Sequence, residues 1–395
     1  MVDRIQVYGL PEELEFVRDI ARRFTETELM PLEKMVQERE ISRGLSAEPL
    51  IPKEVHEHLD KKARELDLFG LDVPEELGGQ GLGFMYKAVV LEEINRSITP
   101  YRLPPESPNL SWLIEEATPE QTEKYLLPYS RGDKRSSLAL TEPNAGSDAA
   151  AIEATATRSE GGWVLNGTKT FISRCDEADF FIVIAVTDKA KRGRGGISAF
   201  LVDKGTPGFK IGRYIWTMGY DTPSELIFED CFVPDSQVLG EIGWAFKPLQ
   251  KRLGVRRSEI AARCLGHAER LVQLMVDQAN NRVTFGKPLA ERQAVQWMIA
   301  DSVMSIHAAR LMVMDVAAKM DAGVPDVRNE SSIAKVFATE MVSTIVDRAL
   351  QLHGGIGYTK DSPIEFIYRN SRALRIVEGA SEIHRRQIAR FRLQG

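Results

Sequence analysis

The chain has 395 residues, a formal net charge of −6 and a pI near 5.7. A chain of this length exceeds the usual single-domain size, so two or three packed units are expected. The net negative charge gives no general attraction for nucleic acid or anionic membrane, and no apolar run is long enough to cross a bilayer. We therefore expect neither partner. The absence of a signal-peptide core in residues 1–9 favours a cytoplasmic location.

Cysteine and histidine spacing gives no sign of a disulfide framework or a metal centre. Cys175, Cys231 and Cys264 are odd in number and widely separated, so we expect reduced, structural thiols. His56 and His58 form the only close histidine pair, and no third ligand follows at metal spacing. No bound metal is expected.

The first part of the chain has a helical pattern. Apolar residues recur every three or four positions, as at Leu14, Val17, Ile20 and Phe24. This spacing predicts an N-terminal helical domain over residues 1–130. Glycine and proline interrupt the pattern at residues 75–83 and 100–108, where loops are expected.

The helical period disappears near Arg131, and short β-branched or aromatic runs replace it. These runs are Trp163–Leu165, Phe180–Val186, Ile197–Val202 and Leu226–Val233. They predict a middle antiparallel β domain over residues 131–240. Asn166-Gly167, between two such runs, is the sequence typical of a two-residue hairpin turn.

Helical spacing returns after Gly243 and continues almost to the end of the chain. One helix face is marked by Ile260, Cys264, Ala268, Leu271 and Met275. Several long helices in succession predict a C-terminal four-helix-bundle domain over residues 241–395. The expected fold class is α+β, mainly α.

Four segments, in order along the chain, resemble the acyl-CoA dehydrogenase family. They are LALTEPNAGSDAAAI (Leu138–Ile152), RVTFGKPLAERQ (Arg282–Gln293), QLHGGIGY (Gln351–Tyr358) and RIVEGASEIHRRQIAR (Arg375–Arg390). The resemblance covers essentially the whole chain. It implies an FAD enzyme with helical, β and four-helix domains, acting on acyl-CoA and passing electrons to an electron-transfer flavoprotein.

The resemblance also implies a homotetramer, arranged as a dimer of dimers, in which one subunit reaches the FAD of its neighbour. Arg282, Thr284 and Phe285 take that role by correspondence. An arginine fork suits a pyrophosphate. The other positions that correspond to FAD contacts are Leu140, Thr141, Ser147, Phe171, Ser173, Gln293, Gln351, Gly354 and Gly355.

The expected chemistry is removal of hydrogen from the α and β carbons of an acyl thioester, which gives a trans-2-enoyl-CoA. Glu378 corresponds to the family's base for the α proton, while the flavin accepts the β hydride. In the family, the backbone N–H of that glutamate and a ribityl hydroxyl polarise the thioester carbonyl. Ser147, Arg257 and Gly379 correspond to substrate-binding positions, Arg257 toward the CoA moiety.

Some members place the base on the long helix that follows the β domain. Arg256 occupies that position here and cannot act as a base. Glu259 lies one turn further along, and a salt bridge with Arg256 or Arg263 explains it as well. Glu378 is therefore the predicted base.

Departures from the family pattern surround the expected flavin and acyl pocket. Leu138 replaces a frequent aromatic residue, Phe171 a frequent Trp, Val377 a frequent Tyr and Ala380 a frequent Thr. Smaller side chains make room for a branched, cyclic or aromatic acyl group. We expect a substrate other than a simple straight-chain fatty acyl-CoA.

Three alternatives stay open from the sequence. They are an acyl-CoA oxidase, an enoyl-CoA reductase on the same scaffold, and a non-catalytic family member. Oxidases generally carry an additional C-terminal domain, which disfavours the first. The acyl group, the physiological direction, the electron acceptor and the oligomeric state are not determined by the sequence.

Overall fold

A computed structural model describes residues 11–105 and 108–393. The segment in which no signal-peptide core is expected, and part of the loop expected at residues 100–108, lie outside the described residues. The chain divides into two compact units, each taken here by itself. The helical unit comprises Met1–Asp72, Gly81–Arg102 and Gly254–Gly395, and the β unit comprises Val73–Gln80 and Leu103–Leu253.

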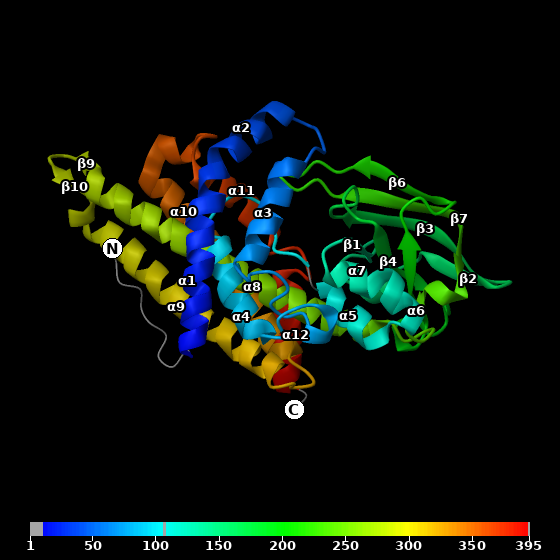
Figure 1. The fold of residues 1–395 in the computed structure, drawn as a ribbon. Helices are drawn as coiled ribbons and strands as arrows, with labels where there is room; N and C mark the ends of the chain where they lie inside the picture. The colour runs from blue at the N-terminus through cyan, green and yellow to red at the C-terminus, as the bar shows by residue number, and fades with distance from the viewer. Residues whose placement is uncertain (1–10, 106–107, 394–395) are drawn as a thin grey trace. The chain divides into compact units, whose positions relative to one another are not determined.

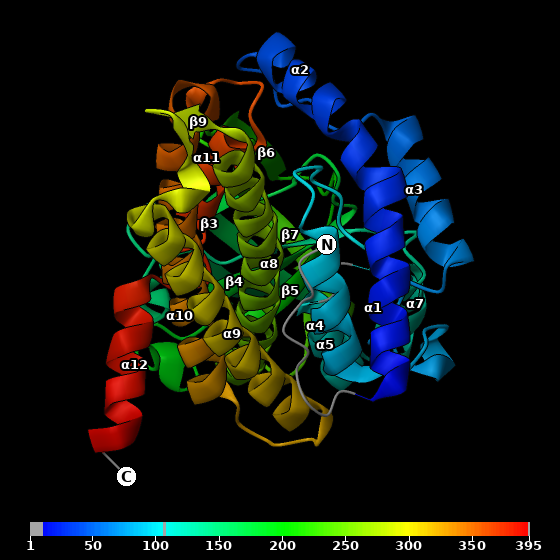
Figure 2. The same ribbon diagram turned by 90° about the vertical axis from the view of Figure 1, so that its left-hand side faces the viewer.

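The helical unit is built almost entirely of helices (Figure 1). They are α1 (Glu12–Phe24), α2 (Glu33–Arg43), α3 (Lys53–Glu65), α4 (Gly83–Ile94), the part of α8 (Phe246–Asn281) from Gly254 onward, α9 (Gln293–Asp321), α10 (Arg328–His353), α11 (Pro363–Ala373) and α12 (Ser381–Leu393). A two-stranded hairpin, β9 (Val283–Thr284) with β10 (Lys287–Pro288), follows α8. Because α9 and α10 are joined by a short loop, they run antiparallel along each other (Figure 2).

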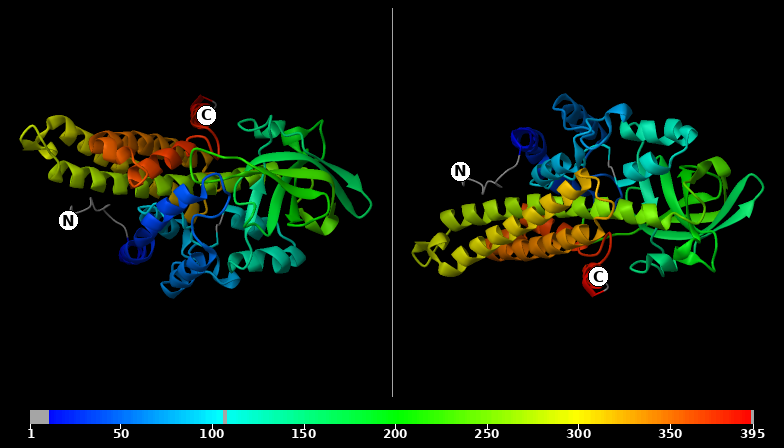
Figure 3. Two further views of the ribbon diagram at one scale, coloured as in Figure 1. Left: turned by 90° about the horizontal axis from the view of Figure 1, so that it is seen from above. Right: turned by 90° about the horizontal axis from the view of Figure 1, so that it is seen from below.

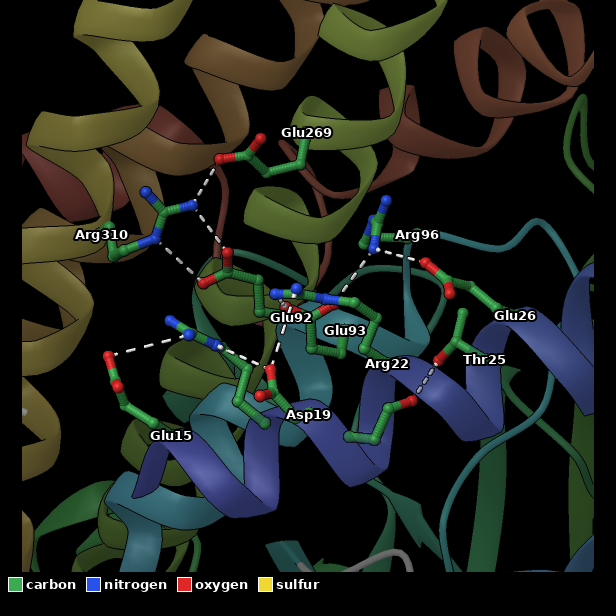
Figure 4. A network of polar contacts seen from close by, with 12 residues as sticks. Glu15, Asp19, Arg22, Thr25, Glu26, Glu92, Glu93, Arg96, Glu269 and Arg310 are labelled. Atoms are coloured by element: carbon green, nitrogen blue, oxygen red, sulfur yellow. Dashed lines mark hydrogen bonds and ion pairs between the residues drawn. The ribbon is translucent and has the colours of Figure 1, made fainter. Parts of the chain in front are cut away.

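A network of charged side chains joins the central helices of this unit (Figure 4). Arg310 on α9 donates to Glu92 on α4 at 2.7 Å and to Glu269 on α8 at 2.6 Å. Arg22 on α1 donates to the neighbouring Glu93, which is completely buried. Buried carboxylates are stable only when they are paired, so these contacts fix α1, α8 and α9 against α4.

The β unit contains one sheet of eight strands. The strands are β1 (Ser136–Ala139), β2 (Thr155–Ser159), β3 (Gly162–Ile172), β4 (Phe180–Val186), β5 (Ile197–Asp203), β6 (Phe209–Tyr214), β7 (Ser224–Pro234) and β8 (Val238–Leu239). Their order is β6-β7-β3-β2-β4-β5-β8, with β1 beside β4. Pairing is antiparallel except where β4 meets β1 and β2. Figure 3 shows these green strands as one twisted sheet.

Strand β4 is buried on both faces, which explains its uninterrupted apolar sequence. Phe180, Ile182 and Ile184 pack in a cluster with residues of α5 (Pro108–Glu116) and α7 (Leu127–Ser130). Phe181 and Val183 point to a second cluster, formed by side chains of the sheet itself. The short helices α5, α6 (Pro119–Gln121) and α7 therefore belong with the sheet.

The hairpin expected at Asn166-Gly167 is wrong. Strand β3 continues through both residues, and the turn that joins it to β2 lies at Glu160 and Gly161. Asn166 and Gly167 form an irregularity in the pairing with β7, where the Asn166 side chain exchanges two hydrogen bonds with Asp230. Asn and Gly are also favoured at bulges, so the dipeptide alone did not distinguish the two structures.

The expected fold class is confirmed, with helices first, an antiparallel β region in the middle and helices last. The boundaries at residues 130 and 240 stay a prediction. The pattern of apolar residues grouped α5–α7 with the earlier helices, because helical spacing does not reveal which surface a helix covers. Within residues 11–105 and 108–393, no helix is long and apolar enough to cross a membrane.

Candidate active site

Glu378 lies in a tight turn between α11 and α12. Its φ is +56° and that of Gly379 is +104°, so two successive residues have left-handed backbone. This conformation is uncommon and costly for a non-glycine residue. The turn is closed by hydrogen bonds from Val377 N to Ala373 O and from Ser381 N to Arg375 O. Strained backbone of this kind is concentrated at functional sites.

Buried side-chain donors hold both carbonyls of this turn. Arg257 Nε donates to the Glu378 carbonyl at 3.1 Å, and His384 Nε2 lies 3.2 Å from the same oxygen. Lys335 Nζ donates to the Gly379 carbonyl at 2.8 Å. Lys335 and His384 are completely buried and Arg257 is 4% exposed. The turn is therefore anchored from α8, α10 and α12.

His384 is neutral, and its hydrogen bonds define which ring nitrogen carries the proton. Burial, together with the nearby charges of Arg257 and Lys335, lowers the pKa of His384 to about 3, so the ring is neutral at neutral pH. A neutral imidazole has one donor nitrogen. Because Nε2 faces the Glu378 carbonyl, the proton is assigned to Nε2, and Nδ1 accepts from Ser332 Oγ at 3.1 Å. Burial also lowers the pKa of Lys335 to about 8.

Gly379 is required by space as well as by backbone conformation. A Cβ atom at this position would lie 2.9 Å from Nε2 of His384. A methyl carbon and a ring nitrogen do not approach so closely unless one of them is displaced. The glycine next to the predicted base thus permits both the turn and its anchor.

Arg257 is placed beneath the Glu378 turn by its hydrogen bond to that backbone. Its correspondence to a CoA-binding position stays a prediction. The sequence did not indicate the contact with Glu378, since the two residues are 121 positions apart.

Glu259, the alternative base, is an ion-paired buried residue. It is 3% exposed, with Lys87 Nζ at 2.7 Å and Arg256 Nη1 at 2.9 Å. Burial by itself raises the pKa of Glu259, but these two cations outweigh burial and lower the pKa to about 2. A carboxylate held so firmly in its charged form is a poor proton acceptor near neutral pH.

Arg282, Thr284 and Phe285 belong to the hairpin at the end of α8. Phe285 and Gly286 both have positive φ, as a two-residue turn of this kind requires. Arg292 braces the hairpin by donating to the Thr284 carbonyl at 2.7 Å. The side chain of Phe285 is 100% exposed, so this strained turn presents an aromatic ring to the surroundings.

The remaining predicted FAD contacts of the helical unit lie at the same end of the α9–α10 pair as this hairpin. Gln293 begins α9, whereas Gln351, Gly354 and Gly355 end α10 or follow it. Lys335, which contacts the Glu378 turn, precedes Gly354 by 19 positions, or roughly 28 Å of helix. The structure therefore separates these residues from Glu378 within one copy of the unit.

In the β unit, a buried ion pair anchors the segment that contains Thr141. Lys169 Nζ, completely buried, lies 2.7 Å from Glu142 Oε1 and donates to the Leu140 carbonyl at 3.1 Å. Thr170 N donates to the Thr141 carbonyl at 2.8 Å. These contacts fasten the segment to β3. Burial lowers the pKa of Lys169 to about 8.

The other predicted residues of this unit differ in accessibility. Leu140 packs against the apolar cluster beside β4, and Ser147 is exposed. Phe171, the last residue but one of β3, has a φ of +57° and is 59% exposed. Ser173 Oγ donates to Asp221 at 3.0 Å, a partner that the sequence did not indicate. Thr141 and Phe171 lie beside each other through the Thr141–Thr170 hydrogen bond.

Two glycines fit the approach of a bound group. At Gly146 and Gly355 an added Cβ would meet nothing within 4 Å, and neither residue has a positive φ. Neither the fold nor the backbone conformation of this chain therefore requires glycine there. Both lie in segments that resemble flavin-contacting motifs, where a missing side chain lets a ligand reach the backbone. The residues present thus fit FAD.

Sequence reasoning missed five residues that hold these segments. They are Glu142, Lys169, Ser332, Lys335 and His384. The available indication was a charged residue on an otherwise small and apolar helix face, as at Lys335 beside Ala334 and Ala338. Such a residue is unusual unless it is paired.

The three cysteines are expected to be reduced, structural thiols. Cys175, Cys231 and Cys264 are free and buried, and burial raises the pKa of each thiol, to about 12, 11 and 12. Thiols of this kind are unreactive. Among the described residues, no group of three or more His, Cys, Asp or Glu side chains is arranged to hold a metal ion.

Three family models match the chain in succession. They are described as the acyl-CoA dehydrogenase N-terminal domain (residues 11–133), middle domain (137–231) and C-terminal domain (243–393).

Known relatives are similar over almost the whole chain. The (R)-benzylsuccinyl-CoA dehydrogenase of Thauera aromatica is 46% identical, covering 97% of this chain and 96% of the relative. The acryloyl-CoA reductase (NADH) of Anaerotignum propionicum is 38% identical, with 97% and 95% covered. The 3-(aryl)acrylate reductase of Clostridium sporogenes is 39% identical, with 96% and 98% covered.

Solved structures give the same result. Butyryl-CoA dehydrogenase from Megasphaera elsdenii superposes with a TM-score of 0.87 at 31% identity, covering 98% of this chain and 100% of the other. The FAD complex of PigA gives 0.85 at 26% identity, covering 99% and 100%. A chain solved in work on the electron transferring flavoprotein of Acidaminococcus fermentans gives 0.86 at 33% identity, covering 99% and 100%.

Proposed function

The chain belongs to the acyl-CoA dehydrogenase family of FAD-dependent oxidoreductases, and from this membership we propose that it oxidises an acyl-CoA thioester between its α and β carbons. Glu378 is the proposed base. The anchored turn at Glu378 carries this proposal, because three buried donors hold the backbone on which the carboxylate is mounted. Buried ion pairs meanwhile occupy the competing carboxylate, Glu259.

Glu378 takes the α proton and holds it on its carboxylate. A proton next to a thioester is weakly acidic, so a suitably placed base must be supported by donors to the thioester oxygen as negative charge develops there. The backbone N–H of Glu378 is the donor that this chain supplies, and Gly379, next to it, is a proposed substrate contact through its backbone. Bound FAD supplies the acceptor for the β hydride.

The proposed FAD contacts are given for each unit by itself. Thr141, Ser147, Phe171 and Ser173 are the proposed contacts in the β unit, with Leu140 supplying backbone rather than side chain. Arg282, Thr284, Phe285, Gln293, Gln351, Gly354 and Gly355 are the proposed contacts in the helical unit. Because the second set lies roughly 28 Å of helix away from the Glu378 turn, we assign it to the FAD of another copy.

Self-association follows from this assignment, and a homotetramer is the proposed assembly. Phe285 is fully exposed at the hairpin tip. Along α9, the apolar side chains of Trp297, Met304 and Leu311 repeat every seven residues and are 47–61% exposed. A long helix with such a stripe is typical of a surface that a second copy covers.

A bulky acyl group is the proposed substrate. The relative with 46% identity is named for benzylsuccinyl-CoA, and one with 39% is named for 3-(aryl)acrylate. Val377, next to Glu378, is 43% exposed and smaller than the tyrosine frequent in the family, which leaves space beside the base. Straight-chain acyl-CoAs are expected to be poorer substrates.

The reverse reaction is the second candidate, because two of the relatives are named as reductases. The same base would then deliver a proton to the α carbon of an enoyl-CoA. For oxidation, an electron-transfer flavoprotein is the proposed acceptor, a choice supported by the likeness to the chain solved in work on such a protein. Comparing rates with this acceptor, with oxygen and in the reductive direction separates these possibilities.

Anaerobic mixing of the FAD-loaded protein with a panel of acyl-CoAs tests the proposal. Loss of flavin absorbance reports reduction. A Glu378→Gln variant is expected to lose roughly 100- to 10,000-fold in the rate of this step, the usual contribution of a general base. Glu382→Gln, at an exposed glutamate in the first turn of α12, is the matched control. Flavin bleaching by Glu378→Gln at the wild-type rate would exclude Glu378 as the base.

A further inference from the structure

The backbone of the Glu378–Gly379 turn does not maintain its own conformation. Glu378 has a φ of +56°, which an L-residue with a side chain adopts only at a cost. The adjacent residue, Gly379, is the most conformationally permissive type. A chain left to local preferences would populate other conformations, so the surroundings must impose this one.

Two side chains that have no other role in the proposed reaction impose the conformation of this turn. Lys335, in the first half of α10, donates to the Gly379 carbonyl at 2.8 Å. His384, in the first turn of α12, lies 3.2 Å from the Glu378 carbonyl. Both are completely buried, and burying a cation or an imidazole is unfavourable unless hydrogen bonds compensate. Both act on the two peptide units that directly follow the predicted base.

We propose that Lys335 and His384 are positioning residues for Glu378, which fix the turn in the conformation that α-proton abstraction requires; this inference rests on the proposed function. Ser332 completes the arrangement, because its hydroxyl faces Nδ1 of His384 and leaves Nε2 as the donor. Rigid placement of a base matters, since small displacements of reacting groups cost large factors in rate.

Peptide geometry explains how these contacts act on the backbone amides that follow Glu378. The C=O and N–H of a trans peptide point in opposite directions. When Arg257 and His384 hold the Glu378 carbonyl, the N–H of Gly379 is directed away from them. Lys335 directs the N–H of Ala380 in the same way through the Gly379 carbonyl. The orientation of both amides thus depends on buried side chains from other helices.

The test uses full-length, FAD-loaded protein with the variants Lys335→Met, His384→Leu, His384→Gln and Ser332→Ala. A 3-thia-acyl-CoA has sulfur in place of the β carbon, so it can lose its α proton but has no β hydride to transfer. Its α-proton exchange in deuterated buffer therefore measures proton abstraction alone. Affinity for the analogue, FAD content and melting temperature are recorded for each variant.

Lys335→Met and His384→Leu are expected to slow exchange on the order of 10- to 100-fold, with affinity changed less than about threefold. His384→Gln retains an amide donor and is expected to restore most of the rate. The matched control is Lys87→Met. Lys87 is also an ion-paired lysine, with a side chain only 11% exposed, and it is joined to Asp72 and Glu259 on other parts of the unit. It is expected to lower the melting temperature without slowing exchange.

If Lys335 has a merely structural role, a different result is expected. Lys335→Met and Lys87→Met then lower the melting temperature alike, and the folded fraction of each variant exchanges the α proton at the wild-type rate. That result would overturn the proposal. If Lys335→Met or His384→Leu does not fold, Ser332→Ala decides, because it removes one hydroxyl only. Exchange slowed about threefold or more in folded Ser332→Ala supports the proposal, and an unchanged rate overturns it.

Failure of the proposed function gives a separate pattern. If Glu378→Gln exchanges the α proton as fast as the wild type, Glu378 is not the base and the function itself is wrong. If Glu378→Gln abolishes exchange while the Lys335, His384 and Ser332 variants behave like the wild type, only the positioning role fails.

Discussion

The buried ammonium of Lys169 on β3 lies 2.7 Å from a carboxylate oxygen of Glu142, and so joins the middle of a strand to the segment that begins at Thr141. Glu142 also accepts hydrogen bonds from the backbone N–H groups of Glu153 and Ala154. One carboxylate thus fastens both ends of the segment that is proposed to contact the flavin.

Lys169→Met should lower the free energy of unfolding by roughly 3–5 kcal/mol, because it leaves Glu142 charged and buried without its cation. Chemical denaturation measures this change, and the absorbance of retained flavin measures FAD binding, which is also expected to weaken. Lys210→Met is the matched control. Lys210 pairs with Glu229 on the same sheet, but both side chains are more than 60% exposed, so a cost within about 1 kcal/mol is expected. Equal costs in the two variants would contradict the anchoring role.

Glu259→Gln separates the two candidate bases. Removal of the buried Glu259 charge leaves the largely buried Lys87 and Arg256 with one partner fewer, so the free energy of unfolding should fall by roughly 3 kcal/mol. The rate of flavin reduction by the folded protein should stay within about threefold of wild type, whereas Glu378→Gln loses most of it. If Glu259→Gln instead reduces the flavin much more slowly than Glu378→Gln, the base is Glu259 on α8.

His384 should make stability depend on pH in the acid range. Its pKa is about 3 in the folded protein and near 6.5 in the unfolded chain, so the unfolded state binds a proton that the folded state does not. The stabilisation is complete above pH 6.5 and is lost as the pH falls toward 3. About 2 kcal/mol of this loss is expected at pH 5. The free energy of unfolding of His384→Gln should therefore change less between pH 7 and pH 5 than that of the wild type. An equal change in the two proteins would mean that His384 is charged in the folded protein.

Phe285→Ala should weaken assembly without destabilising the individual subunit. Because Phe285 is fully exposed, its truncation removes no packing within the chain, and a change in subunit stability within about 0.5 kcal/mol is expected. Light scattering after size-exclusion chromatography should show a smaller species at low concentration, together with faster loss of FAD. Ile356→Ala, at another exposed apolar residue (72%), tests whether the same end of α10 takes part. An unaltered tetramer with normal FAD retention in both variants would exclude the proposed interface.

Val377→Tyr should change substrate preference. A larger side chain beside Glu378 fills the space that we assign to a bulky acyl group, so kcat/KM should fall about tenfold more for aryl-substituted than for short straight-chain acyl-CoAs. Steady-state assays with both substrate classes measure the ratio. Ile376→Tyr is the control, because Ile376 precedes Val377 in the same turn and is also exposed. A uniform loss for all substrates would show that Val377 does not set the acyl specificity.

The order and type of the elements could be predicted because they depend on local patterns. The uninterrupted apolar run at Phe180–Val186 became a fully buried strand, and the three- and four-residue spacing before Phe24 became α1. The Asn166-Gly167 prediction failed because the same dipeptide also suits a bulge, and β7 opposite decided between the two. For α5–α7, helical spacing predicted the helices, and packing showed which apolar cluster they join.

By itself, the sequence determined the family and the cofactor and predicted the reaction and the base, since these follow from motifs whose residues lie close together in the chain. Only the tertiary structure placed Lys335 and His384 against the Glu378 turn, paired Glu259 with Lys87, and separated Gly354 and Gly355 from Glu378. The physical reason is that a buried charge is compensated by partners distant in sequence. Lys335 and Gly379 are 44 positions apart, so their contact exists only once α10 has packed beside the turn.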